Sequence, residues 1–215
     1  MPSACLRALS LAALLLTVPV TAISGARSAE AAETPKATVE ELNAALLDTM
    51  KNADALGYQG RYDKLAPVLK ETFDFPAMAQ VILGAYWSSI SDAQQQAFIE
   101  TFTDYSIGVF ADRFNGFEGE RFEVLGEEEA RRGAMLVRNQ IVKGDGEAVA
   151  INYLVKPDIK PEKGTANWRI VDTILGGMAS ELATRRAEYD GIMDKLGVDG
   201  LIRALKKKTA AFAEN

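Results

Sequence analysis

The spacing of apolar residues changes twice along the chain, and these changes limit the possible folds more than any other feature. Across residues 39–114, apolar side chains recur at steps of three and four residues, the pattern of amphipathic helices. Across residues 121–175 they alternate, which is typical of β-strands. Helical spacing returns across residues 182–205. This order predicts an α+β domain in which helices pack on one face of a curved four-stranded antiparallel sheet.

The helical regions contain local start and stop signals. Ser91 and Gln94 form a capping box, in which the serine side chain accepts a hydrogen bond from a free amide of the first turn. The helix that follows carries on one face Phe98, Phe102, Tyr105 and Val109. Before it, Pro76 suits the first turn of a short helix. Gly57 and Gly60 are expected to interrupt the helical pattern further upstream.

The alternating region is divided by turn residues. Strands are predicted over residues 121–125, 134–142, 147–156 and 167–175. Residues 143–146, Lys-Gly-Asp-Gly, are predicted to form a hairpin turn, because Asp-Gly tolerates positive φ. Connections this short favour antiparallel pairing. Residues 127–133, rich in glutamate and arginine, are expected to be a solvated connection between strands.

The strands are apolar on both sides. In the third strand, Ile151 and Tyr153 share one side, while Ala150 and Leu154 make the other side apolar too. In a sheet with one solvent-exposed face, apolar and polar residues would alternate more regularly. We therefore expect that both faces are covered or that one face lines an apolar cavity. The sequence does not determine which face of the sheet points inward, because a shift of one residue exchanges the two faces. The residues expected to line a cavity between helices and sheet are Met78, Ile82, Phe102, Tyr105, Met135, Val137, Ile151, Tyr153, Trp168 and Ile170.

The N-terminus has the layout of a secretory signal peptide. Arg7 is the only charge before a short apolar run, and small residues follow that run. The run is shorter than the ~20 apolar residues of a spanning helix, which disfavours the alternative of an uncleaved anchor. We expect residues 1–26 to be the signal peptide, cut somewhere between residues 22 and 31. Residues 27–38 are then a flexible linker, and residues 39–211 a single domain.

Composition excludes several classes of protein. The chain has no histidine, which removes Ser-His-Asp and Cys-His catalysis and histidine metal sites. Its formal net charge of −6 does not fit a nucleic-acid binder. No metal constellation is visible, and no cofactor is expected. Asp172 and Glu181 leave a carboxylate-dependent hydrolase open. A pairing of Asp172 with an arginine, or a cap at the Gly176-Gly177 turn, is the simpler explanation of Asp172. Glu181 and Arg185 are spaced as an ordinary exposed pair.

A set of short motifs, in order and spacing, resembles the MlaC family, also called the toluene-tolerance auxiliary component of a lipid ABC transporter. The resemblance covers residues 39–208. The motifs are residues 73–79 (FDFPAMA), Leu83-Gly84, Tyr86-Trp87, the Ser91 helix ending in Arg113, residues 168–172 (WRIVD), Gly177, Arg185 and residues 197–202 (GVDGLI). Residues 60–67 and 180–189 are similar to the hopanoid-associated subgroup called HpnM. The aromatic residue expected at position 188 lies one residue later, at Tyr189.

The resemblance implies a function. Members of the family are soluble periplasmic carriers that enclose the apolar part of a lipid, here a phospholipid or a hopanoid, and shuttle it between inner and outer membranes. This activity serves outer-membrane lipid asymmetry. The implied partners are an inner-membrane lipid transporter and outer-membrane lipoprotein complexes, with no nucleotide, nucleic acid or catalytic residue. Two other readings stay open: an envelope adaptor protein without lipid, and the carboxylate-dependent hydrolase.

Overall fold

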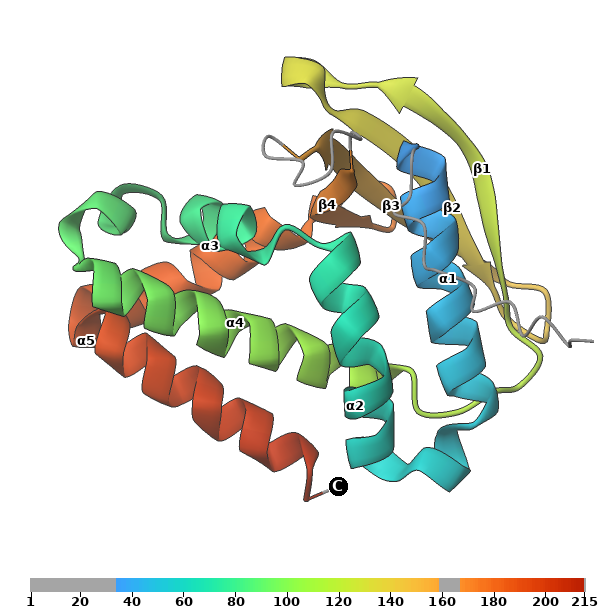
Figure 1. Cartoon of the computed structure of the whole chain (residues 1–215), viewed down its shortest axis with the longest axis horizontal. Helices are drawn as coiled ribbons and strands as arrows, with labels where there is room; N and C mark the ends of the chain where they lie inside the picture. The colour runs from blue at the N-terminus through green and yellow to red at the C-terminus, as the bar shows by residue number, and fades with distance from the viewer. Residues whose placement is uncertain (1–33, 159–166, 215) are drawn as a thin grey trace, which may run out of the picture. The chain divides into compact units, whose positions relative to one another are not determined.

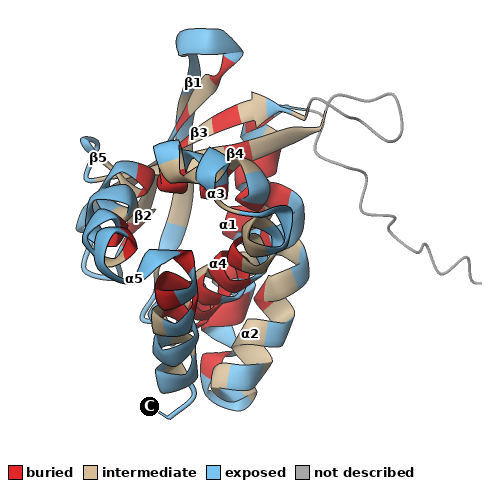
Figure 2. Ribbon diagram, turned by 90° about the vertical axis from the view of Figure 1, so that its left-hand side faces the viewer, coloured by how far each residue is buried: buried red, intermediate tan, exposed pale blue. Residues whose placement is uncertain are grey.

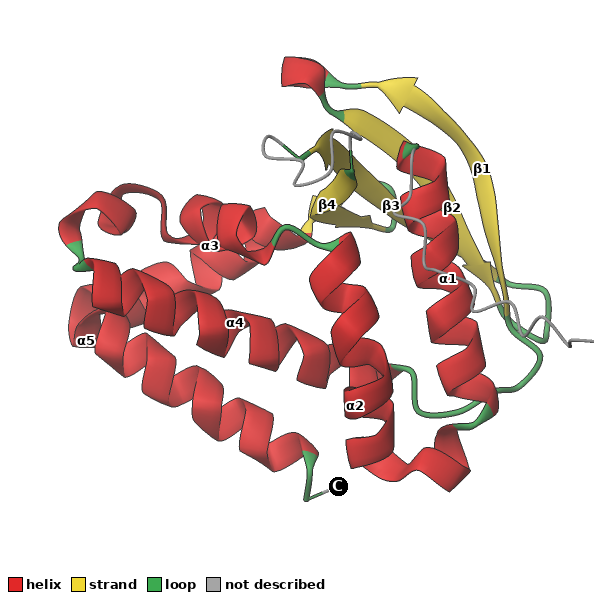
Figure 3. Cartoon of the chain, viewed as in Figure 1, coloured by secondary structure: helices red, strands yellow, loops and turns green. Residues whose placement is uncertain are grey.

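The computed structural model describes residues 34–158 and 167–214. Figures 1 and 3 show their arrangement, in which five α-helices and an antiparallel meander form an α+β fold, as predicted. The elements in chain order are α1 (Pro35–Lys51), α2 (Ala53–Thr72), α3 (Phe75–Leu83), the 3₁₀ helix η1 (Gly84–Ser89), α4 (Asp92–Arg113), β1 (Arg121–Glu129), η2 (Arg131–Gly133), β2 (Met135–Val142), β3 (Ala148–Pro157), β4 (Trp168–Leu175), β5 (Ala179–Ser180) and α5 (Glu181–Phe212).

Helix α1 begins earlier than the sequence pattern indicated. The Thr34 side chain caps the helix by accepting from the Ala37 amide at 3.1 Å, and Pro35 occupies the first turn. Residues 35–38, expected to belong to a flexible linker, are therefore helical. Thr38 is buried, and its hydroxyl donates to the Trp168 carbonyl oxygen at 3.1 Å. The predicted signal peptide and cleavage site lie outside the described residues.

The sheet has the order β1-β2-β3-β4-β5, with every neighbouring pair antiparallel. It contains one strand more than predicted, because the two residues of β5 pair back onto β4. The predicted hairpin turn joins β2 to β3, and Gly146 there has a φ of 92°. The first strand continues through Glu129, so the expectation that residues 127–129 form a connection is wrong. A bulge between Val124 and Gly126 absorbs the extra residue and lets pairing resume.

One face of the sheet is covered by helices. The register places Val137 opposite Tyr153, and Tyr153 opposite Thr173, so these side chains share that face. Helix α1 packs on it through residues such as Leu42, and the Asn43 amide donates to the Asn139 side chain at 2.8 Å in the buried contact. Figure 2 shows the buried segments gathered between the helices and this face. The opposite face remains partly exposed, so the sheet is covered on one side rather than both.

The remaining helices enclose the space beside α1. The capping box predicted at Ser91 and Gln94 is present at the start of α4. Helix α5 breaks at Gly197, where φ is 62°, and both of its halves lie along α4 (Figure 1). Gly57 breaks α2 as predicted, with φ of 59°, whereas Gly60 lies inside regular helix. No helix within the described ranges has both the length and the hydropathy required to cross a membrane.

Candidate functional site

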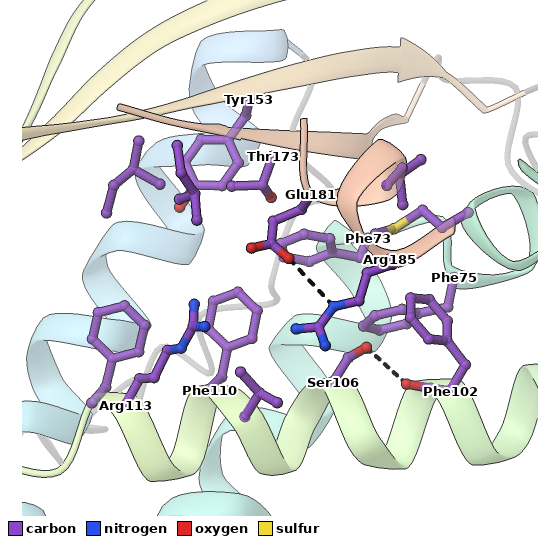
Figure 4. A pocket seen from close by; sticks show the side chains of 16 residues that line it. Phe73, Phe75, Phe102, Ser106, Phe110, Arg113, Tyr153, Thr173, Glu181 and Arg185 are labelled. Atoms are coloured by element: carbon purple, nitrogen blue, oxygen red, sulfur yellow. Dashed lines mark hydrogen bonds and ion pairs between the residues drawn. The ribbon is translucent and has the colours of Figure 1, made fainter. Parts of the chain in front are cut away.

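A partly open cavity of about 180 Å³ lies between the helices and the sheet (Figure 4). Helices α3, α4 and α5 contribute one side of it, and strands β3 and β4 contribute the other. Most of its wall is apolar, with two arginines and one glutamate among the lining side chains. The lining residues are Phe73, Phe75, Met78, Phe102, Ser106, Val109, Phe110, Arg113, Phe114, Ile151, Tyr153, Thr173, Leu175, Glu181, Leu182 and Arg185.

The helical wall of the cavity is a single stripe along α4. Its members recur at three- and four-residue steps, so they project from one face of the helix. They are Phe102, Ser106, Val109, Phe110, Arg113 and Phe114. From Phe102 to Arg113 this stripe runs for about 16 Å, at the helical rise of ~1.5 Å per residue. The cavity is therefore elongated along α4 and has two chemically distinct ends.

One end of the cavity is a cluster of aromatic rings. The Phe73 ring stacks on Phe75 with centroids 5.6 Å apart and meets Phe110 edge to face at 5.6 Å. Phe75 contacts Phe102 in the same manner at 6.0 Å. Phe73 also meets Tyr153 of β3 edge to face at 6.5 Å. Burial raises the pKa of the Tyr153 phenol, which stays neutral. These contacts tie helices and sheet together and make a rigid apolar wall.

A charged group lines the cavity beside this wall. The Arg185 guanidinium lies 3.3 Å from a Glu181 carboxylate oxygen and 3.7 Å from Glu188. It also donates to the Tyr105 hydroxyl at 2.9 Å. The expectation of an ordinary exposed pair is wrong, because the Arg185 and Glu181 side chains are only 16% and 24% exposed. The break at Gly197 helps to explain this burial, since it folds α5 back along α4.

Asp172 has a structural role next to the cavity. Its carboxylate accepts hydrogen bonds from the Ser180 hydroxyl at 2.6 Å and from the Leu182 amide at 3.2 Å. It therefore satisfies a free amide at the start of α5, rather than capping the Gly176-Gly177 turn or pairing with an arginine. Asp172 is not among the residues that line the cavity. In residues 34–158 and 167–214, no group of three or more histidine, cysteine or acidic side chains is placed to hold a metal ion.

Several of the sequence-predicted residues meet in this cavity. Those that line it are Met78, Phe102, Ile151 and Tyr153. Those placed elsewhere are Ile82, Tyr105, Met135, Val137, Trp168 and Ile170. Val137 and Ile170 are fully buried, because α1 fills the space over their part of the sheet. Ile82 is buried in the packed core, and Tyr105 contacts Arg185 of α5.

The cavity also includes residues that the sequence pattern did not select. Thr173 and Leu175 line it because they lie opposite Tyr153 and Ile151 in the β3–β4 register. Phe110 lies about two turns beyond Phe102 on the same face of α4. Its spacing from Phe102 was a usable signal. Arg113 was visible only as the end of the helix, and nothing in the sequence placed its side chain in the cavity.

Comparisons with known proteins agree with this architecture. A solved structure of a phospholipid-binding protein from Ralstonia solanacearum, in complex with a phospholipid, matches with a TM-score of 0.70. It is 22% identical, and the match covers 85% of this chain and 99% of that one. The intermembrane phospholipid transport system binding protein MlaC of Haemophilus influenzae is 24% identical over 132 residues. That match spans 60% of this chain and 59% of the relative, so the chain matches about three fifths of that protein's length.

A family model supplies the assignment. The model described as MlaC protein matches residues 40–207, which includes α3, α4, every strand and most of α5. The match covers the elements that build the cavity. No comparison distinguishes the hopanoid-associated subgroup, which stays a prediction. With its fold shared by a phospholipid-binding protein and its sequence matched over most of its length, the chain belongs to the MlaC family.

Proposed function

We propose that the protein is a periplasmic lipid carrier that holds the acyl chains of a phospholipid between α4 and strands β3 and β4. The observation that carries this proposal is the apolar, aromatic-walled cavity between helices and sheet. Each methylene removed from water contributes about 0.8 kcal/mol, so an enclosed chain is held by burial alone. The names of the two similar proteins, which concern phospholipid binding and intermembrane phospholipid transport, support the choice of cargo.

The size of the cavity sets a condition on loading. Its volume of about 180 Å³ is below the ~300–1,000 Å³ of typical ligand pockets. A phospholipid with two chains contains ~30 methylenes and does not fit this space. The helices and the sheet therefore move apart when the lipid enters.

A hopanoid is the second candidate cargo. This assignment rests on the similarity of residues 60–67 and 180–189 to the hopanoid-associated subgroup. The two cargoes differ in charge: a phospholipid carries an anionic phosphate, whereas the polycyclic body of a hopanoid does not.

The cellular route follows from the same proposal. Export through a cleaved signal peptide at residues 1–26 places the carrier in the periplasm. It then receives lipid from one membrane complex and delivers it to another, an inner-membrane transporter and an outer-membrane lipoprotein complex. Membership of the MlaC family supports this route. The adaptor reading differs in predicting a stable complex with a single membrane partner and no bound lipid.

The proposal is tested by transfer of lipid between vesicles. Donor vesicles carry a tail-labelled fluorescent phosphatidylglycerol, and acceptor vesicles of dioleoylphosphatidylcholine carry none. We expect catalytic amounts of the purified protein to raise the transfer rate in proportion to protein concentration. A protein with the cavity blocked by Ser106→Trp, at the centre of the α4 stripe, serves as the matched control. If both proteins fold and neither accelerates transfer, the carrier proposal is wrong.

A further inference from the structure

The two guanidinium groups that line the cavity differ in their partners. Arg185 is neutralised by Glu181 and Glu188 and donates to Tyr105. Arg113, the last residue of α4, has no carboxylate or hydrogen-bond partner among the described residues. Within residues 34–158 and 167–214, the one carboxylate that lines the cavity is Glu181, which already pairs with Arg185. Arg113 is therefore a cation in the cavity wall that the described residues leave without a carboxylate partner.

Arg113 lies at the end of the cavity away from Phe75 and Met78. It projects from the final turn of α4 beside Phe110 and Phe114, whose rings stack with centroids 5.8 Å apart. Figure 4 shows its side chain extending into the cavity from the helix. Arg113 is exposed to solvent, whereas Phe75 and Met78 at the other end are buried. The cavity thus runs from a closed apolar end to an open end that carries a positive charge.

From this arrangement we infer that Arg113 binds the phosphate of the cargo lipid. The inference rests on the proposed carrier function and assigns the orientation of the cargo. The acyl chains point toward Phe75 and Met78, and the phosphate lies at the mouth. A guanidinium group presents paired N–H donors that match two phosphate oxygens, and such charge-assisted hydrogen bonds are strong. The inference also selects a phosphate-bearing lipid over an uncharged polycyclic one.

A simpler role for Arg113 makes a different prediction. A cation in the last turn of a helix interacts favourably with the helix dipole, whatever lies in the cavity. Lys70 likewise lies in the last turn of its helix, α2, is exposed, and does not line the cavity. The variant Lys70→Gln therefore removes the same charge from the same kind of helix end. It is the matched control for Arg113→Gln.

The test compares two lipids that differ only in the phosphate headgroup. The delipidated mature protein is titrated calorimetrically with dioctanoylphosphatidylglycerol and with dioctanoylglycerol, below their critical micelle concentrations. We expect Arg113→Gln to weaken binding of the phospholipid about tenfold, as loss of one charge-assisted contact implies, and to leave dioctanoylglycerol unchanged. Arg113→Lys should retain part of the affinity. Lys70→Gln should bind both lipids like the wild type, and the selectivity should shrink as salt increases.

The possible results separate the inference from the carrier proposal. If the wild type binds both lipids equally and Arg113→Gln changes neither, the phosphate role of Arg113 is overturned and the carrier function stands. Equal losses in Arg113→Gln and Lys70→Gln would show that net charge is responsible, which also overturns it. If the wild type binds neither lipid, both proposals fail. Thermal unfolding of each variant establishes that the folds are intact.

Discussion

Introducing a carboxylate at two positions on the same face of the sheet should separate lipid binding from folding. Ile151 lines the cavity from β3 and is only partly buried. Val137 lies on the same face of the neighbouring strand, but it is 0% exposed beneath α1. The account therefore predicts opposite outcomes for Ile151→Asp and Val137→Asp. The first should fold and lose lipid, and the second should fail to fold stably.

The magnitudes follow from what surrounds each carboxylate. At Val137 an unpaired buried charge costs on the order of 3–5 kcal/mol, in addition to lost packing, against a total stability of about 5–15 kcal/mol for a typical domain. At Ile151 water in the open cavity can hydrate the charge, so the cost to the fold is about 1–2 kcal/mol. An acyl chain would displace that water. The penalty of about 3–5 kcal/mol then falls on binding, a loss of roughly two to four orders of magnitude in affinity.

The assay combines lipid phosphorus per mole of purified protein with thermal unfolding followed by circular dichroism. Ala150→Asp is the control, because residue 150 is the next residue of β3 and faces away from the cavity. We expect Ala150→Asp to retain lipid and Ile151→Asp to retain none. Once both proteins are delipidated, their melting temperatures should differ by only a few degrees. If Ile151→Asp keeps the wild-type amount of phosphorus, or Val137→Asp is as stable as the wild type, the assignment of the cavity is wrong.

Three further outcomes follow from the same structure. Asp172→Ala removes the acceptor for Ser180 and for the start of α5, so the free energy of unfolding in a denaturant titration should fall by about 2 kcal/mol; no change would refute the cap. Burial, and then the charge of Glu71, raise the pKa of Glu41 above its ordinary 4.5, so ionisation of Glu41 destabilises the fold. Glu41→Gln should therefore raise the melting temperature at pH 7, and this gain should disappear below pH 4.5; a gain independent of pH would contradict the assignment. Delipidation should lower the melting temperature, and adding phospholipid back should restore it, because ligand bound only to the folded state stabilises it.

Local patterns predicted the order of elements and several of their boundaries. The capping box at Ser91 fixes the start of α4, and the Asp-Gly turn before Glu147 fixes the β2–β3 hairpin. These features depend on neighbouring residues alone, so the sequence contains the whole signal. The additional length of β1 was missed because Glu127 and its neighbours look solvated. They are solvated, but on an edge strand, and a bulge keeps their backbone paired with β2.

The candidate site was predicted only in part, because the packing of the helices on the sheet depends on residues that are far apart in the sequence. Alternation correctly grouped Val137 with Tyr153 on one face, which is the face that the helices cover. Whether a residue on that face contacts a helix or lines the cavity depends on which part of the face α1 packs against. Tyr153 reaches the cavity, whereas Val137 lies under α1. Arg113 was missed for a related reason, because a charge at a helix end has an ordinary local explanation.

The central claim is that the space between helices and sheet holds a lipid, and native mass spectrometry tests it most directly. The protein is released from the periplasm by osmotic shock, purified without detergent and sprayed from ammonium acetate. The account predicts a complex heavier than the mature polypeptide by the mass of a phospholipid, which dissociates as collision energy rises. If only the bare polypeptide mass is seen at the lowest collision energy, the space is not a lipid site.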